Sequence, residues 1–241
     1  MEQIIYHPVL LRLERVLQSI EGKDKIARLA QYLSRYLAFY YLGQGKRNQI
    51  ILFTNLRNTI SIIRKYIRFF ECFQYLNNIN DIFRSGNDKI DLIVKHLSVI
   101  KNFFYFFYLL FDSMFFLNLL KMLNLKRKDL RTLRHLVNIN WFMGIFSNIL
   151  VNIRRHVINH RKLQSATGIG RSSSEDDQLE VKKYLDRCYA ERHSIRRRLL
   201  WDALDLAIVA SRLNIVKVNE GYLGLAGVLT SVLALQDIYQ K

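Results

Sequence analysis

The most regular hydrophobic pattern in the chain runs from Phe53 to Leu76. Its apolar residues recur at steps of three and four, the period of one helix face, and they are Phe53, Leu56, Ile60, Ile63, Ile67 and Phe70. The remaining sector holds the basic residues Arg57, Arg64, Lys65 and Arg68. An apolar face with a cationic flank is typical of a helix lying in a membrane interface. It is also typical of a helix packed on its own protein's core, so this stretch alone leaves both interpretations open.

Two amphipathic helices are predicted before this segment. The first covers Val9 to Ile20 and is expected to end at Glu21-Gly22, because glycine commonly follows a helix C-terminus. The second covers Lys23 to Tyr41, with an apolar stripe that includes Ile26, Leu29, Leu33 and Leu37 and with the basic residues Lys25, Arg28 and Arg35. Its tyrosines suit a water–lipid boundary or the surface of a helical bundle. Gly43 and Gly45 predict a joint after it, and the stretch from Asn77 to Asn87 predicts the end of the third helix.

The most apolar run extends from Leu97 to Leu120. From Phe103 onward, eighteen residues contain one charge, Asp112. At about 1.5 Å per residue such a helix is just long enough to cross a bilayer core of about 30 Å. Asp112 near its centre would cost about 2.5–3.5 kcal/mol unless it is paired or faces a cavity. We therefore predict a transmembrane helix here, with a buried helix of a soluble bundle as the alternative.

Two shorter apolar segments follow. Leu136 to Val151 fits a buried or re-entrant segment better than a span, and Lys121 to His135 reads as a polar connector before it. Gly221 to Leu235 is also short, but tilt or local thinning of the bilayer would let it cross. With the segment from Leu199 to Val218 it predicts a C-terminal helical hairpin. The candidates for lining a pore or for helix packing are Asp112, Asp202, Asp205, Arg212, Gly227 and Ser231.

A polar linker is predicted from Gln164 to Gln178. Its serines, Ser172, Ser173 and Ser174, precede three acidic residues and are candidates for phosphorylation or for capping the next helix. The chain then divides into four regions: an amphipathic remodelling region (1–90), hydrophobic helices with a basic connector (91–163), the linker (164–178), and a basic helix with the hairpin (179–241). The predicted fold class is all-α and membrane-associated.

Composition reduces the number of function classes that fit the chain. The net charge is +17, yet half of the residues are hydrophobic. This combination favours an anionic lipid surface over nucleic acid, for which no recognition module is visible. His156 and His160 lie four residues apart but lack the glutamate of a zinc-protease motif, so no metal site is expected. The chain also lacks a nucleophile elbow, a phosphate loop and a dinucleotide fingerprint, which predicts a protein that is not an enzyme and needs no cofactor.

Three blocks resemble the peroxin-11 family of membrane-shaping peroxisomal proteins, in particular its fungal members. The first is YHP at Tyr6–Pro8 together with GKDKIARLAQYLSRYLA at Gly22–Ala38. The second is LRNTISIIRKYIRFF at Leu56–Phe70. The third joins RRLLWDALDLAIV at Arg197–Val209 to NEGYLGLAGVLTSVLALQDIY at Asn219–Tyr239 and is the most specific. The resemblance covers essentially the whole chain.

The resemblance implies a protein of the peroxisomal membrane that elongates or tubulates it before fission. It makes Arg57, Arg64, Lys65 and Arg68 contacts to lipid headgroups and makes Ile60, Ile63, Ile67 and Phe70 the inserting wedge. The implied partners are anionic phospholipid, further copies of the chain, the peroxisomal fission machinery and the import receptor for membrane proteins. The family's other discussed role, a solute-conducting channel, is the alternative. The number of spans, from one to four, stays open.

Overall fold

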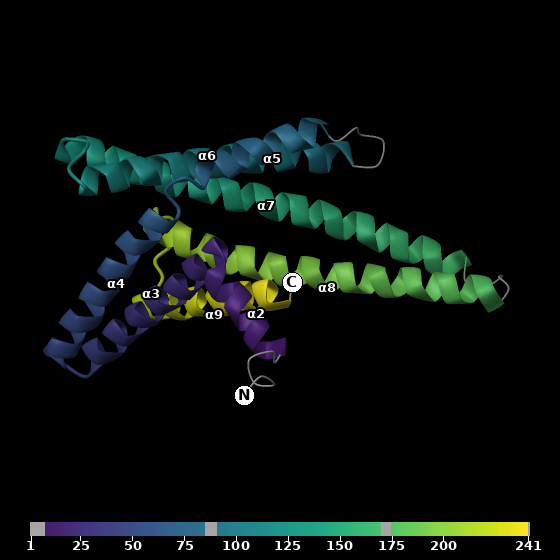
Figure 1. Ribbon diagram of the computed structural model, residues 1–241, viewed down its shortest axis with the longest axis horizontal. Helices are drawn as coiled ribbons and strands as arrows, with labels where there is room; N and C mark the ends of the chain where they lie inside the picture. Colours follow the sequence, from purple (N-terminus) through teal and green to yellow (C-terminus); the bar gives the residue numbers. More distant parts are fainter. Residues whose placement is uncertain (1–7, 85–90, 170–174, 241) are drawn as a thin grey trace.

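The structure is a computed structural model that describes residues 8–84, 91–169 and 175–240, and within these ranges it contains helices and no strand. This confirms the predicted all-α fold class. The helices are α2 (Pro8–Gln18), α3 (Ile20–Gly43), α4 (Arg47–Ile67), α5 (Cys72–Arg84), α6 (Leu92–Leu119), α7 (Arg127–Ile169), α8 (Glu175–Arg212) and α9 (Glu220–Gln240). Figure 1 shows α5, α6 and α7 along one side of the molecule, with α8 beside α7 and with α2, α3, α4 and α9 gathered below.

The first break in the chain lies earlier than predicted. Ser19 separates α2 from α3, and its hydroxyl accepts a hydrogen bond of 3.0 Å from the backbone N–H of Gly22. Gly22 therefore belongs to the first turn of α3 and does not end α2. A Cβ atom at this position would lie 1.9 Å from the backbone oxygen of Val16. The glycine is required by the close approach of the two helices rather than by a helix end.

The predicted helix from Phe53 to Leu76 is two helices. The chain turns between Arg68 and Glu71, so that α4 packs on α3 while α5 packs on α6. The predicted break from Asn77 onward is wrong as far as Arg84, because α5 continues through the asparagines. Packing on α6 supports it there: the rings of Tyr75 and Tyr105 stack at 5.4 Å. Tertiary contact has overridden the weak helix propensity of asparagine.

Three of the described helices, α6, α7 and α9, are long and apolar enough to cross a membrane. For α6 this agrees with the prediction. Leu136 to Val151 was predicted to be buried or re-entrant, and the re-entrant alternative is wrong, because these residues lie in the middle of the continuous 43-residue α7. Several of them, including Trp141 and Ile145, are buried. The predicted connector shortens to 120–126, since the basic residues from Arg127 onward already belong to the helix. The apolar run is shorter than the helix, because α7 also includes polar turns on either side of the run.

The apolar core joins α3, α7, α8 and α9. Its buried members are Tyr32, Trp141, Ile145, Ile208, Val209 and Leu223. The C-terminal hairpin is confirmed, with 213–219 connecting α8 to α9. The small-residue face of α9, however, lies against α3: a Cβ atom at Gly227 would come within 2.1 Å of the Tyr32 ring. Close approach at Gly227 therefore joins two helices of the same chain.

Candidate functional site

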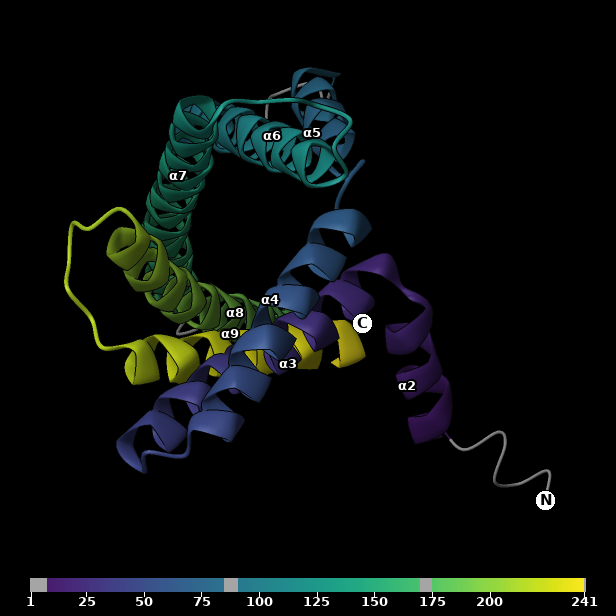
Figure 2. The same ribbon diagram turned by 90° about the vertical axis from the view of Figure 1, so that its left-hand side faces the viewer.

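A cavity of about 1090 Å³ lies between the helices. It is lined by residues of α3, α4, α5, α6, α7 and α8, by the turn after α4 and by Glu220 at the start of α9. Figure 2 views these helices from one end of the molecule, where they surround a common central region. Among the described residues that line the cavity, eleven are lysines or arginines and seven are aspartates or glutamates. The lining is therefore strongly charged, with an excess of four positive charges.

The charged lining follows from helical spacing on each wall. Polar residues recur at steps of three or four and so share one face of each helix. On α3 these residues are Asp24, Arg28, Gln31 and Arg35, on α4 and the turn after it they are Ser61, Arg64, Lys65 and Arg68, and on α6 they are Lys101, Tyr105, Tyr108 and Asp112. The apolar faces of α3 and α4 point away from the cavity, where Ile26, Leu33, Leu56 and Ile63 are exposed. These helices are thus polar toward the interior and apolar outside.

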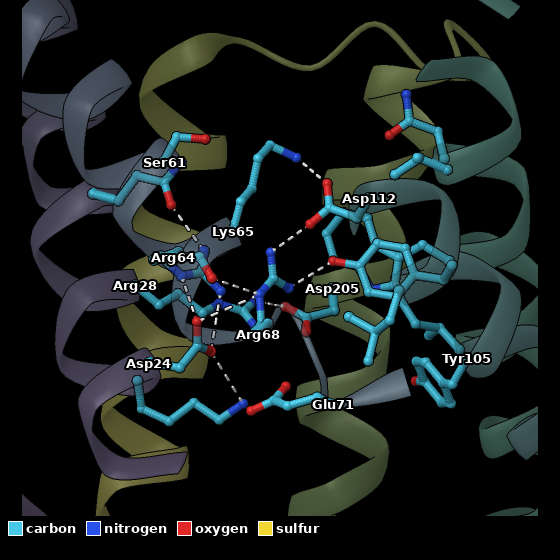
Figure 3. A pocket seen from close by; sticks show the side chains of 18 of the residues that line it. Asp24, Arg28, Ser61, Arg64, Lys65, Arg68, Glu71, Tyr105, Asp112 and Asp205 are labelled. Atoms are coloured by element: carbon cyan, nitrogen blue, oxygen red, sulfur yellow. Dashed lines mark hydrogen bonds and ion pairs between the residues drawn. The ribbon is translucent and has the colours of Figure 1, made fainter. Parts of the chain in front are cut away.

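Arg64 joins α4 to α3 (Figure 3). Its guanidinium donates two hydrogen bonds of 2.9 and 3.2 Å to the carboxylate of Asp24, and a third of 2.8 Å to Gln31 Oε1. Arg68 Nε lies 3.6 Å from the same carboxylate. Burial by itself would raise the pKa of Asp24, but the charges of Arg64 and Arg68 outweigh it and hold that pKa well below the usual aspartate range. Asp24 is therefore a charged anchor for both arginines.

Asp112 joins the same basic face to α6. Lys65 forms an ion pair with it, and Arg68 Nη2 donates to it at 3.0 Å. Arg68 Nη1 also donates to the hydroxyl oxygen of Tyr108 at 2.8 Å. Burial first, and the positive charges of Arg68 and Arg212 next, together lower the pKa of Lys65 to about 7. The cost of placing Asp112 in an apolar helix is thus offset by paired cations from α4 and its following turn.

The opposite wall is held by α8. Asp205 forms an ion pair with Arg28 of α3 and accepts a hydrogen bond of 3.2 Å from Trp201 Nε1. Asp202 accepts hydrogen bonds of 2.8 and 2.9 Å from the side-chain amides of Asn148 and Asn152.

Burial raises the pKa of Asp202 to about 6. The negative charge of Asp205 acts in the same direction, while the two amides and Lys101 oppose it. Asp202 is thus a buried carboxyl group without an ion-pair partner within the described chain.

The structure turns all four predicted headgroup residues toward the cavity. Arg64, Lys65 and Arg68 are paired there with Asp24 and Asp112, whereas Arg57 lies 3.9 Å from Glu220. Their role as lipid contacts stays a prediction. The predicted inserting residues divide into exposed and half-buried groups. Leu56, Ile63 and Phe70 are 43%, 47% and 72% exposed, and Phe53, Ile60 and Ile67 are half-buried.

The second amphipathic helix follows the same arrangement. Lys25, Arg28 and Arg35 line the cavity, while Ile26 and Leu33 are exposed and Leu29 and Leu37 are half-buried.

The candidate residues for pore lining or helix packing fall into two groups, those that line the cavity and those that do not. Asp112, Asp202, Asp205 and Arg212 all line the cavity, although they come from two helices far apart in the sequence. Gly227 and the fully buried Ser231 do not line it, and the Ser231 hydroxyl donates to the backbone oxygen of Gly227 at 2.6 Å. The serines predicted as phosphorylation sites, Ser172 to Ser174, lie outside the described residues.

Sequence reasoning missed the partners that make this a site. Asp24, Tyr108 and Trp141 carried no recognised motif, yet each holds a cationic side chain in the cavity. A signal was present: Asp24 and Arg28 lie four residues apart on the face opposite the apolar stripe of α3. That spacing marks a polar face but does not say which helix meets it.

Comparison with known proteins shows to which family the chain belongs. Residues 10–239 match the family model of peroxisomal biogenesis factor 11 (PEX11). The chain is 30% identical to peroxisomal membrane protein PMP27 of Saccharomyces cerevisiae, over 99% of this chain and 98% of the relative. It is also 30% identical to PMP30B of Candida boidinii, over 98% and 96%, and 24% identical to peroxisomal biogenesis factor 11 of Schizosaccharomyces pombe, over 98% and 97%. No solved structure shows a significant match. The family model covers nearly the whole chain, and the protein therefore belongs to the PEX11 family of peroxisomal membrane proteins.

Proposed function

We propose that this protein elongates the peroxisomal membrane by inserting the outward apolar faces of α3 and α4 into one leaflet, as a step in peroxisome proliferation and fission. The observation that carries the proposal is the inverted polarity of α4. Arg57, Arg64 and Lys65 face the cavity, while Leu56, Ile63 and Tyr66 are exposed on the outside. Apolar side chains in this number are poorly suited to water and well suited to lipid.

The mechanism follows from the leaflet into which the helix inserts. An interfacial helix buried about 5–10 Å deep expands one leaflet more than the other and favours convex curvature. Ile63 exposes about half of its side chain and Phe70 about seven-tenths. Moving such a side chain into lipid contributes roughly 1–2 kcal/mol. Several of them on each copy would hold α4 in the interface, and self-association of the spanning helices would concentrate the wedges.

Contact of Arg64, Lys65 and Arg68 with lipid headgroups is part of the same proposal and requires one further step. These side chains are held by Asp24 and Asp112, so phosphate groups would have to replace the two carboxylates. A basic residue near an anionic surface contributes roughly 1 kcal/mol, less than a buried ion pair is worth when one partner is removed. We expect the apolar face to lead the insertion and the basic residues to contribute after it.

The proposal is tested with the full chain in liposomes that contain anionic phospholipid. Ile63→Asp should abolish tubulation while the protein stays in the membrane through its spanning helices. Ile63→Leu, which keeps an apolar side chain at the same position, and Asn124→Asp, which adds the same charge at an exposed site between α6 and α7, should tubulate like the unmodified protein. Equal tubulation by Ile63→Asp would refute the wedge.

The cavity favours a second function, solute conduction. Its lining is polar, and α6, α7 and α9 around it have the length of membrane spans. Side chains that line such a space determine the sign of the charge that passes. Arg212 is an exposed lining residue, and Arg212→Glu should shift the ion selectivity of full-length protein in a planar bilayer toward cations. A silent bilayer would remove this function and leave the wedge proposal untouched.

A further inference from the structure

The excess positive charge of the cavity gathers around Asp112. Lys65 and Arg68 share this carboxylate, and Arg68 also lies near Asp24, which Arg64 already holds through two hydrogen bonds. Arg134 and Arg212 line the same cavity, and neither has a carboxylate within ion-pair distance in the described part of the chain. With Lys25, which lies 3.9 Å from Asp24, four cationic side chains share these two carboxylates, and Arg134 and Arg212 add two more positive charges.

Aromatic rings hold these cations close to one another. The Phe115 ring lies 5.0 Å from Lys65 Nζ and 5.6 Å from the guanidinium carbon of Arg134. On the other side, Arg212 lies 5.2 Å from the Trp141 ring, which stacks at 5.8 Å on Tyr108, the hydrogen-bond partner of Arg68. The rings attract cations through their faces and bring no negative charge. The positive charges are therefore positioned without being neutralised.

Lys65 and Arg68 are half-buried while Arg134 and Arg212 are exposed, and the like charges of these four side chains repel one another. The repulsion reaches Lys65, whose pKa falls to about 7 through burial first and through Arg68 and Arg212 next. Repulsion would be relieved by an anion. Guanidinium groups bind phosphate oxygens with two parallel hydrogen bonds, whereas a single carboxylate would use few of the donors available here. The whole cavity, of about 1090 Å³, has more room than one phosphate group needs, so there is space here for a phosphate-bearing ligand.

We propose that Lys65, Arg68, Arg134 and Arg212 form a binding site for a phosphate-bearing anion of two to four negative charges. The anion lies between the Phe115 side and the Trp141 side of the cavity, where it supplements Asp112 as counter-charge. Binding there requires neither tubulation nor conduction, so the proposal goes beyond both functions proposed above.

The experiment measures pyrophosphate binding to the full-length protein in dodecyl maltoside by titration calorimetry at low ionic strength. Arg134→Ala and Arg212→Ala should each raise the Kd about tenfold or more, since each removes charged hydrogen-bond donors. Arg131→Ala is the matched control, because Arg131 lies one turn away on α7, is exposed and does not line the cavity. Asp112→Asn should tighten binding several-fold, because it removes a competing negative charge. If Asp112→Asn failed to fold, binding would weaken instead. The direction of the change in affinity therefore distinguishes removal of the competing charge from loss of folding.

A second titration with short-chain phosphatidylinositol bisphosphate identifies the source of the phosphate. If pyrophosphate binds and Arg212→Ala weakens its binding, the result supports a soluble anion. Binding of the lipid alone, weakened in the same variants, supports a lipid headgroup reaching the cavity. Binding of neither probe, or binding that Arg134→Ala and Arg212→Ala leave unchanged, would overturn the proposal.

Discussion

Replacing Asp24 with asparagine tests whether the cavity is held together by buried charge. The carboxylate is 6% exposed, accepts two hydrogen bonds from Arg64 and lies 3.6 Å from Arg68. Asp24→Asn keeps the shape, removes the negative charge and points an amide donor at a guanidinium. Removing one partner of a buried ion pair costs about 3–5 kcal/mol. Because Arg64 keeps its bond to Gln31 and Arg68 keeps Asp112, we expect a loss near the lower end, about 3 kcal/mol.

The assay is a double-mutant cycle with Asp24→Asn, Arg64→Gln and the double variant, each unfolded thermally in detergent and followed by tryptophan fluorescence. The double variant should lose less than the sum of the two single losses, with a coupling of about 2 kcal/mol or more. The pair Arg35 and Glu220 is the control, because Glu220 is 57% exposed and its pairing should contribute under about 1 kcal/mol. A coupling for Asp24 and Arg64 no larger than that of the control would refute the reasoning, since it would mean that water screens the cavity.

Two further predictions concern α9 and the buried carboxyl group of α8. Gly227→Ala should lower the melting temperature by several degrees, because its Cβ would meet the buried ring of Tyr32 at 2.1 Å; Gly43→Ala, where a Cβ meets nothing within 4 Å, should leave it unchanged, and an equal loss in both variants would contradict this packing. The pKa of Asp202 is raised to about 6 from an ordinary 3.8, so the folded protein holds this proton more tightly than the unfolded chain does and loses stability as pH rises from about 4 to about 6. Asp202→Asn should therefore melt at a higher temperature than the unmodified protein at pH 7.5 and at nearly the same temperature at pH 4; a difference that does not vary with pH would rule this out.

Helix content and the apolar faces of α3 and α4 were predictable from local pattern alone. The apolar positions of α4 recur at helical spacing, and the exposed Leu56 and Ile63 lie on the predicted face. Helix ends were harder to predict, because contacts between distant segments determine where a helix ends. Ser19 separates α2 from α3 where glycine was expected to do so, and α5 runs through its asparagines since α6 packs on it. The length of α7 was missed for a different reason: its basic ends are helical but not apolar.

The charged cavity could not be predicted, although its residues could be seen. Periodicity places Arg64, Lys65 and Arg68 on one side of a helix, and that side could meet water, lipid headgroups or another helix. Their partners Asp24 and Asp112 lie 40 and 47 residues away from Arg64 and Lys65 along the chain. No local pattern links residues so far apart, because the pairing depends on how α3, α4 and α6 pack together. Local patterns were enough to predict a helical membrane protein with apolar and cationic faces, whereas the packing of α3, α4 and α6 turns the cationic face inward.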